Sequence, residues 1–204
     1  MKKKFTTEEF LKIMPLGLVE LTETLGHAVY EIDKEILLMA KKDTELLMQR
    51  YKDEEIQRDW KPEQPETMFY GLLGEQIFKA TLYELKIDYQ YAEPMYPHEL
   101  RRPHDFECSG KTIQVKTIQP TKRYKNLTIK LDEWTGSDIT VAIKLIDKKL
   151  TKAHIIGFLT KEEVENLPIS RYEYPCFYDP CYYCLLTEVT EKHPAYELFK
   201  ILKG

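Results

Sequence analysis

The chain has 204 residues, 43% of them hydrophobic, which suffices for one domain with a sizeable core and a small appended region. A net charge of −4 at pH 7 argues against a uniformly basic protein that coats nucleic acid, although it permits a local basic patch. No segment reaches the roughly eighteen consecutive apolar residues of a membrane span, and Lys2-Lys3-Lys4 precedes no apolar signal core. We therefore expect a cytoplasmic protein without a membrane span.

Residues 1–60 predict a helical N-terminal region. They begin with a capping pattern, Thr6-Thr7-Glu8-Glu9, and carry apolar residues at helical spacing, namely Leu18, Leu21, Leu25, Val29, Ile32 and Ile36. Pro62 and Pro65 make residues 58–66 the best candidate for a linker. Three uses of these helices stay open: packing on a sheet, forming a homodimer interface, or clamping DNA.

A β-hairpin is expected around Ser109-Gly110, a turn signal flanked by alternating polar and apolar residues. Centring the turn there pairs residues whose numbers sum to 219. Phe106 then pairs with Ile113 on one face, which supports the register, because a slip of one residue would place an apolar side chain among polar ones.

The same register gathers polar side chains on the other face of the hairpin. Asp105 is expected to face Gln114, and Lys116 shares that face because strand side chains alternate with a period of two. A divalent ion such as Mg²⁺ favours oxygen ligands, which Asp105, the Gln114 amide and the Val115 backbone carbonyl offer. Lys116 would act on a water or on a phosphate. The alternative is an ordinary solvated hairpin face.

With Glu75 upstream in a predicted helix, the order of Glu75, Pro103-His104-Asp105 and Gln114-Val115-Lys116 resembles the PD-(D/E)XK nuclease superfamily over residues 67–160. The resemblance implies an α/β (α+β) fold with a restriction-endonuclease-like core, in which a central mixed sheet is flanked by helices in the order α-β-β-β-α-β. It also implies Mg²⁺- or Mn²⁺-dependent hydrolysis of DNA. Glu75, Asp105, Gln114 and Lys116 match the catalytic positions, and the first three match metal-binding positions.

The motif departs from the family pattern at Gln114, where an acidic residue is usual. A neutral amide binds a cation more weakly than a carboxylate does, so the site would depend more on Asp105 and Glu75 for negative charge. Two interpretations follow: an active nuclease, or a nuclease-fold protein without catalysis that acts in nucleic-acid binding or assembly.

Two basic clusters border the proposed hairpin and are candidates for binding DNA phosphates, with solvated loop charges as the alternative. Their residues are Arg101, Arg102, Lys122, Arg123 and Lys125.

The nuclease-like core is expected over residues 66–168. After the hairpin, a short alternating strand begins at Asn126, and the apolar run 139–146 predicts a central strand covered on both faces. Residues 153–159 predict another strand, and the capping box Thr160-Lys161-Glu162-Glu163 opens a short helix that ends before Pro168.

Residues 169–204 form a Cys- and Tyr-rich extension that we expect to pack on the core. Its three cysteines, together with one at the hairpin turn, could ligate Zn²⁺ or an iron–sulfur cluster, or be reduced buried thiols of a cytosolic chain. The four residues are Cys108, Cys176, Cys181 and Cys184.

Overall fold

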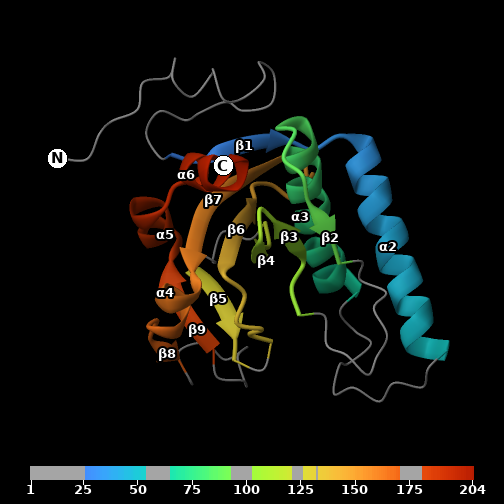
Figure 1. Cartoon of the computed structure of the whole chain (residues 1–204). Coiled ribbons are helices and arrows are strands. Elements are labelled where there is room, and N and C mark those ends of the chain that lie inside the picture. The colour runs from blue at the N-terminus through green and yellow to red at the C-terminus, as the bar shows by residue number, and fades with distance from the viewer. Residues whose placement is uncertain (1–25, 54–64, 93–102, 121–125, 132, 171–180) are drawn as a thin grey trace.

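The computed structural model describes residues 26–53, 65–92, 103–120, 126–131, 133–170 and 181–204. They form an α+β fold around a mixed six-stranded sheet (Figure 1). Across the sheet the order is β1 (Ala28–Glu31), β7 (Lys152–Thr160), β6 (Ile139–Leu145), β4 (Lys111–Ile118), β3 (Phe106–Cys108) and β2 (Gln90–Tyr91).

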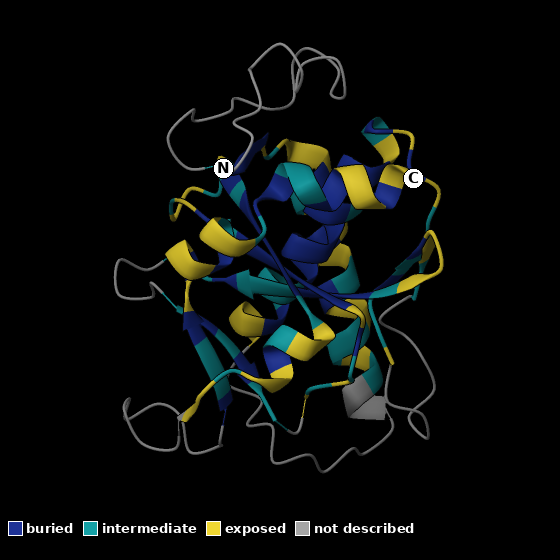
Figure 2. Ribbon diagram, turned by 60° about the vertical axis from the view of Figure 1, so that its left-hand side comes forward, coloured by how far each residue is buried: buried dark blue, intermediate teal, exposed yellow. Residues whose placement is uncertain are grey.

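The predicted central strand is confirmed. β6 lies between β4 and β7, and all but one of its residues are buried, as its apolar and β-branched sequence indicated. It runs parallel to β4 and antiparallel to β7. Figure 2 shows the sheet strands predominantly in the buried colour, with exposed residues on the outer helices and turns.

One face of the sheet is covered by α3 (Pro65–Glu84), with α2 (Lys34–Asp53) outside it, and by α6 (Ala195–Lys203) (Figure 1). α3 is buried along most of its length, as expected of a helix between a sheet and another helix. Its closest approach to β4 is at Gly74, where even a β-carbon would collide with the side chain of Thr117. The glycine therefore fixes where α3 crosses β4.

The other face packs against a three-stranded antiparallel sheet of β5 (Asn126–Lys130), β9 (Cys181–Leu185) and β8 (Ile169–Ser170). A second core cluster fills this interface, with Ile118 and Ala142 from the large sheet against Leu127 and Ile129 from the small one. α4 (Lys161–Glu165) and α5 (Leu186–Lys192) border it. The capping box of α4 is formed as predicted: the Thr160 hydroxyl accepts from the Glu163 N–H, and the Glu163 carboxylate accepts from the Thr160 N–H.

The N-terminal region is not uniformly helical. Val29, expected on a helix, lies in β1, which pairs antiparallel with β7 and completes the large sheet. β-branched and aromatic residues at 29 and 30 favour a strand, and a buried partner strand outweighs the helical spacing. Pro65, expected in a linker, opens α3, where a proline ring is well accommodated. Residues 1–25 lie outside the described part of the chain.

The connection from β4 to β6 differs from the order that the resemblance implies. The resemblance implies a helix between these parallel strands, whereas the described part of the connection contains β5, the short strand that its own sequence predicted from Asn126. The elements of the three expected regions also share a core, since β1 and α6 contribute residues to the same cluster as β4 and β6. None of the described helices combines the length and apolar character needed to cross a membrane.

Candidate functional site

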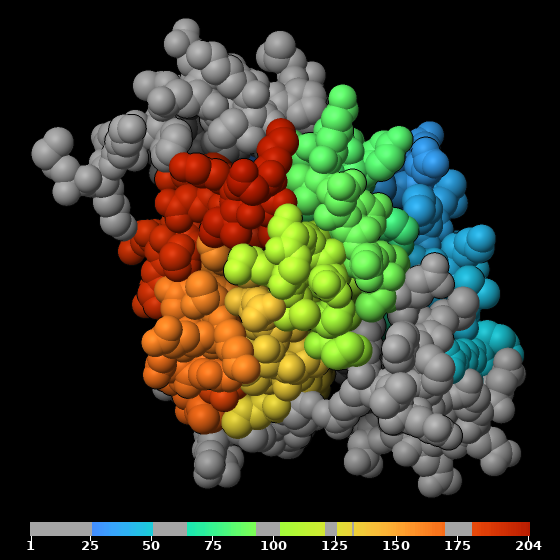
Figure 3. Space-filling model, in the orientation of Figure 1, coloured from blue at the N-terminus to red at the C-terminus, as the bar shows by residue number. Residues whose placement is uncertain are grey.

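The hairpin of β3 and β4 has the predicted register. Phe106 pairs with Ile113, and Cys108 pairs with Lys111, so the residue numbers of each pair sum to 219. Ser109 and Gly110 at the turn have φ angles of 50° and 71°, the left-handed conformation that a two-residue hairpin turn requires. In Figure 3 the hairpin (yellow-green) reaches the surface below α6 (red) and beside the segment around β2 (green).

Asp105 lies where β3 separates from β4. Its N–H donates to the Ile113 carbonyl at 2.8 Å, and its Oδ2 accepts from the Val115 N–H at 2.6 Å. The paired ladder ends at Phe106, so Asp105 does not continue it as a regular pair with Gln114. Because backbone N–H groups point along the plane of a sheet, the carboxylate lies near that plane, beside the Val115 backbone, and not squarely on the Gln114 face as expected.

Glu75 approaches from α3. It is 8% exposed, and its Oε2 accepts from the Tyr91 hydroxyl at 2.9 Å. Tyr91 packs on Phe106 with ring centroids 4.9 Å apart, and the next residue, Ala92, donates its N–H to the Asp105 carbonyl at 3.0 Å. Tyr91 thus ties the helix carboxylate to the start of β3.

Gln114 is 7% exposed and projects from the opposite face of the sheet to α3. Its Nε2 donates to the Glu133 carbonyl at 3.2 Å, whereas its Oε1 has no hydrogen-bond partner among the described residues. Thr140, beside Gln114 in the parallel register of β6, likewise has a buried Oγ1 with no partner in the described part of the chain. A buried polar atom without a partner is uncommon and calls for an explanation.

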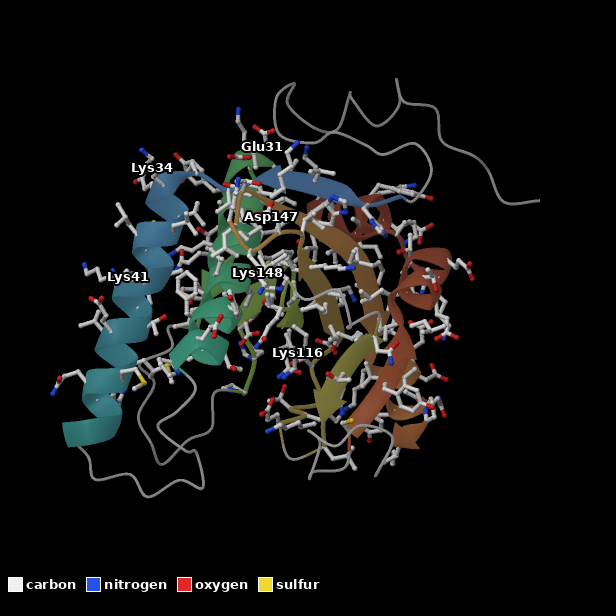
Figure 4. All side chains as sticks on the ribbon, turned by 180° about the vertical axis from the view of Figure 1, so that it is seen from behind. Glu31, Lys34, Lys41, Lys116, Asp147 and Lys148 are labelled. Atoms are coloured by element: carbon white, nitrogen blue, oxygen red, sulfur yellow. The ribbon has the colours of Figure 1, made fainter. Side chains whose placement is uncertain are left out.

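Lys116 projects from the same face and is held by Glu133. Its Nζ lies 3.2 Å from Glu133 Oε2, and Lys130 approaches the other carboxylate oxygen at 3.4 Å. Burial alone raises the pKa of the Glu133 carboxyl, but the two ammonium groups outweigh it and hold that pKa below its ordinary value. Figure 4 labels Lys116 on the side of the molecule away from Glu31.

Asp105, Gln114, Val115 and Lys116 therefore lie together along one stretch of β4, whereas Glu75 lies on the other face of the sheet. Val115 meets Asp105 through its backbone, and Gln114 and Lys116 flank it on the face of Glu133. Glu75 comes from the other face, where α3 packs on Thr117. Among the residues that the structure describes, no three His, Cys, Asp or Glu side chains converge to hold a metal ion.

These donors nevertheless suit a hard cation. The expected ligand set combines two carboxylates with an amide oxygen and a backbone carbonyl, all oxygen ligands of the kind that Mg²⁺ accepts. The Gln114 Oε1 is buried, is an acceptor, and is uncommitted within the described residues. A buried amide oxygen without a hydrogen-bond partner is better suited to bind an oxygen-preferring ion than a solvated surface amide is.

No protein-family model matches the chain, nor does any curated protein or solved structure. The physical case for the site therefore rests on its own residues.

The candidate phosphate-binding residues Arg101, Arg102, Lys122, Arg123 and Lys125 all lie outside the described residues.

The described cysteines do not gather at one site, as a shared Zn²⁺ or iron–sulfur cluster would require. Cys108 belongs to the core cluster on the α3 face, whereas Cys184 belongs to the cluster under the small sheet. Burial raises the pKa of both thiols to about 12, so they are protonated and free. Cys181 is also buried, and Cys176 lies outside the described residues. The alternative expectation, reduced buried thiols, describes the three that are seen.

Two contacts of the site were not anticipated from the sequence. Tyr91 binds Glu75, and Glu133 binds both Gln114 and Lys116. The sequence positions of Tyr91 and Glu133 follow no motif spacing, because each residue reaches the site through tertiary structure and not through its neighbours in the chain.

Proposed function

We propose that the protein is a divalent-metal-dependent nuclease that hydrolyses DNA phosphodiester bonds, built on a restriction-endonuclease-like core. The observation that carries the proposal is the buried Gln114 Oε1, uncommitted within the described residues, on the residue before Val115, whose N–H binds the Asp105 carboxylate, and two residues before Lys116. The hairpin register supports it, because it brings Asp105, just before β3, beside Val115 in β4.

Each residue has a role in this proposal. Asp105, Glu75, the Gln114 amide and the Val115 carbonyl would hold Mg²⁺ or Mn²⁺, which would supply Lewis-acid polarisation of the phosphate and lower the pKa of bound water. Lys116 places a positive charge where negative charge develops on the phosphate during attack. The Val115 N–H orients Asp105 by donating to its Oδ2.

The proposed setting is the inside of the cell. The three described cysteines are buried thiols, which is normal for a chain kept under reducing conditions. DNA is the proposed partner, and the homodimer expected through the N-terminal helices remains a proposal.

Incubation of purified protein with plasmid and linear DNA tests the function. We expect cleavage with Mg²⁺ or Mn²⁺, and none with EDTA or with Asp105→Asn. Absence of cleavage on every substrate, with DNA binding that survives EDTA, would instead support the non-catalytic nucleic-acid-binding protein.

A further inference from the structure

Glu133 contacts both polar side chains of the Gln114-Val115-Lys116 segment. Its backbone carbonyl accepts from Gln114 Nε2, and its carboxylate accepts from Lys116 Nζ, each at 3.2 Å. The residue lies after β5 in the connection to β6, so the β4–β6 crossover passes over the face from which Gln114 and Lys116 project.

The backbone contact sets which end of the Gln114 amide is presented. A carbonyl oxygen accepts hydrogen bonds only, so the amide must turn its NH₂ group toward Glu133. The Oε1 then points away from that carbonyl, and it is this atom that lacks a partner among the described residues. In this orientation a neutral Gln114 offers an oxygen, as a carboxylate at the same position would.

The side-chain contact restrains Lys116. A lysine ammonium sits on a flexible four-carbon stem, so its position depends on its partners. The side chains of Lys116 and Glu133 are 19% and 42% exposed, against 42% and 76% for those of the surface pair Lys152 and Glu31. Water competes less with a half-buried pair than with an exposed one.

We infer that Glu133 is a positioning residue of the proposed nuclease site: its carbonyl orients the Gln114 amide oxygen, and its carboxylate holds the Lys116 ammonium in place for the phosphate. The inference rests on the proposed function. It adds a residue outside the expected motif, one whose carboxylate balances the positive charge of Lys116.

Glu133→Gln tests the role of the carboxylate, because it removes the charge and keeps the backbone carbonyl. We expect kcat for DNA cleavage to fall about tenfold to a hundredfold, since a small displacement of a catalytic group has effects of that size. KM and the dissociation constant for Mn²⁺, measured by calorimetry without DNA, should change less than about twofold, because the Gln114 contact is retained. In the Lys116→Ala background, Glu133→Gln should lower kcat much less than it does in wild type, because the group that Glu133 positions is already absent.

Two matched variants control for the loss of a surface charge. Glu31→Gln removes a carboxylate that also pairs with a lysine, on the strand at the opposite edge of the large sheet (Figure 4). Lys130→Gln removes the other lysine that contacts Glu133 and leaves the Lys116 contact in place. Both should keep kcat within about twofold of wild type.

The inference and the proposed function fail in different ways. If wild type cleaves DNA and Glu133→Gln cleaves equally well, Glu133 has no positioning role. The same conclusion follows if Glu133→Gln weakens Mn²⁺ binding and lowers the melting temperature in parallel. It also follows if Glu133→Gln lowers kcat as much in the Lys116→Ala background as in wild type. If wild type neither cleaves DNA nor binds Mn²⁺, the proposed function is wrong and the role of Glu133 is overturned with it.

Discussion

Asp105 serves two purposes that substitution can separate. Its Oδ2 accepts from the N–H of Val115, a residue 7% exposed, at 2.6 Å, and in our proposal the same carboxylate holds a metal ion. Asp105→Ala removes the acceptor, and a buried N–H left without a partner costs about 1–3 kcal/mol of unfolding free energy. Asp105→Asn keeps an acceptor oxygen, so its cost should be about 1 kcal/mol or less, the difference between a charged and a neutral hydrogen bond.

The two variants should differ in stability but not in their affinity for metal. Both substitutions remove the negative charge, so both should weaken Mn²⁺ binding about tenfold or more, whereas only Asp105→Ala loses substantial stability. Urea unfolding without metal measures stability, and titration calorimetry with Mn²⁺ measures binding. The reasoning is refuted if Asp105→Asn binds Mn²⁺ as tightly as wild type, or if Asp105→Ala unfolds at the same urea concentration as wild type.

Three further predictions concern stability. Without metal, Gln114→Glu should lower the free energy of unfolding by about 1–3 kcal/mol, because a carboxylate oxygen then faces the Glu133 carbonyl. Mn²⁺ should raise the melting temperature of this variant more than that of wild type. Equal increases would contradict the proposed ligand role of Gln114. Gly74→Ala should lower the free energy of unfolding by about 1–3 kcal/mol, measured with urea, because the added β-carbon collides with Thr117. An unchanged urea midpoint would show that α3 shifts freely. Burial, with the nearby positive charges, lowers the pKa of His27 from 6.5 to about 4, so the unfolded chain binds the extra proton between these values. Wild-type stability should therefore fall relative to His27→Gln, by at most about 1.4 kcal/mol per unit, as pH falls through this window; parallel pH profiles for the two proteins would contradict it.

Local sequence rules predicted those parts of the fold that depend on neighbouring residues. Alternation on both sides of Ser109-Gly110 gave the register of β3 and β4, because a slip would bury polar side chains. The Thr160–Glu163 box marked the start of α4 for a similarly local reason. The buried run of β6 could be read from composition alone.

Features that depend on tertiary pairing were missed. Val29 fits a helical spacing, but pairing with β7 makes it a strand residue. Nothing near Glu133 in the sequence indicates Gln114 or Lys116, since β5 carries the loop across the sheet. From the sequence, four cysteines could either share a metal or be buried thiols; Cys108 and Cys184 lie in separate cores, and spacing along the chain does not show which face a strand presents.

The most direct test of the proposed nuclease compares two lysine variants in one cleavage assay. Lys116 lies on β4 at the proposed site, whereas Lys152 pairs with Glu31 near the opposite edge of the large sheet. With saturating Mg²⁺ and a labelled linear duplex, Lys116→Ala should cleave at least about a hundredfold more slowly than wild type, and Lys152→Ala should match wild type. Cleavage by Lys116→Ala at the wild-type rate would contradict the assignment of catalysis to this site.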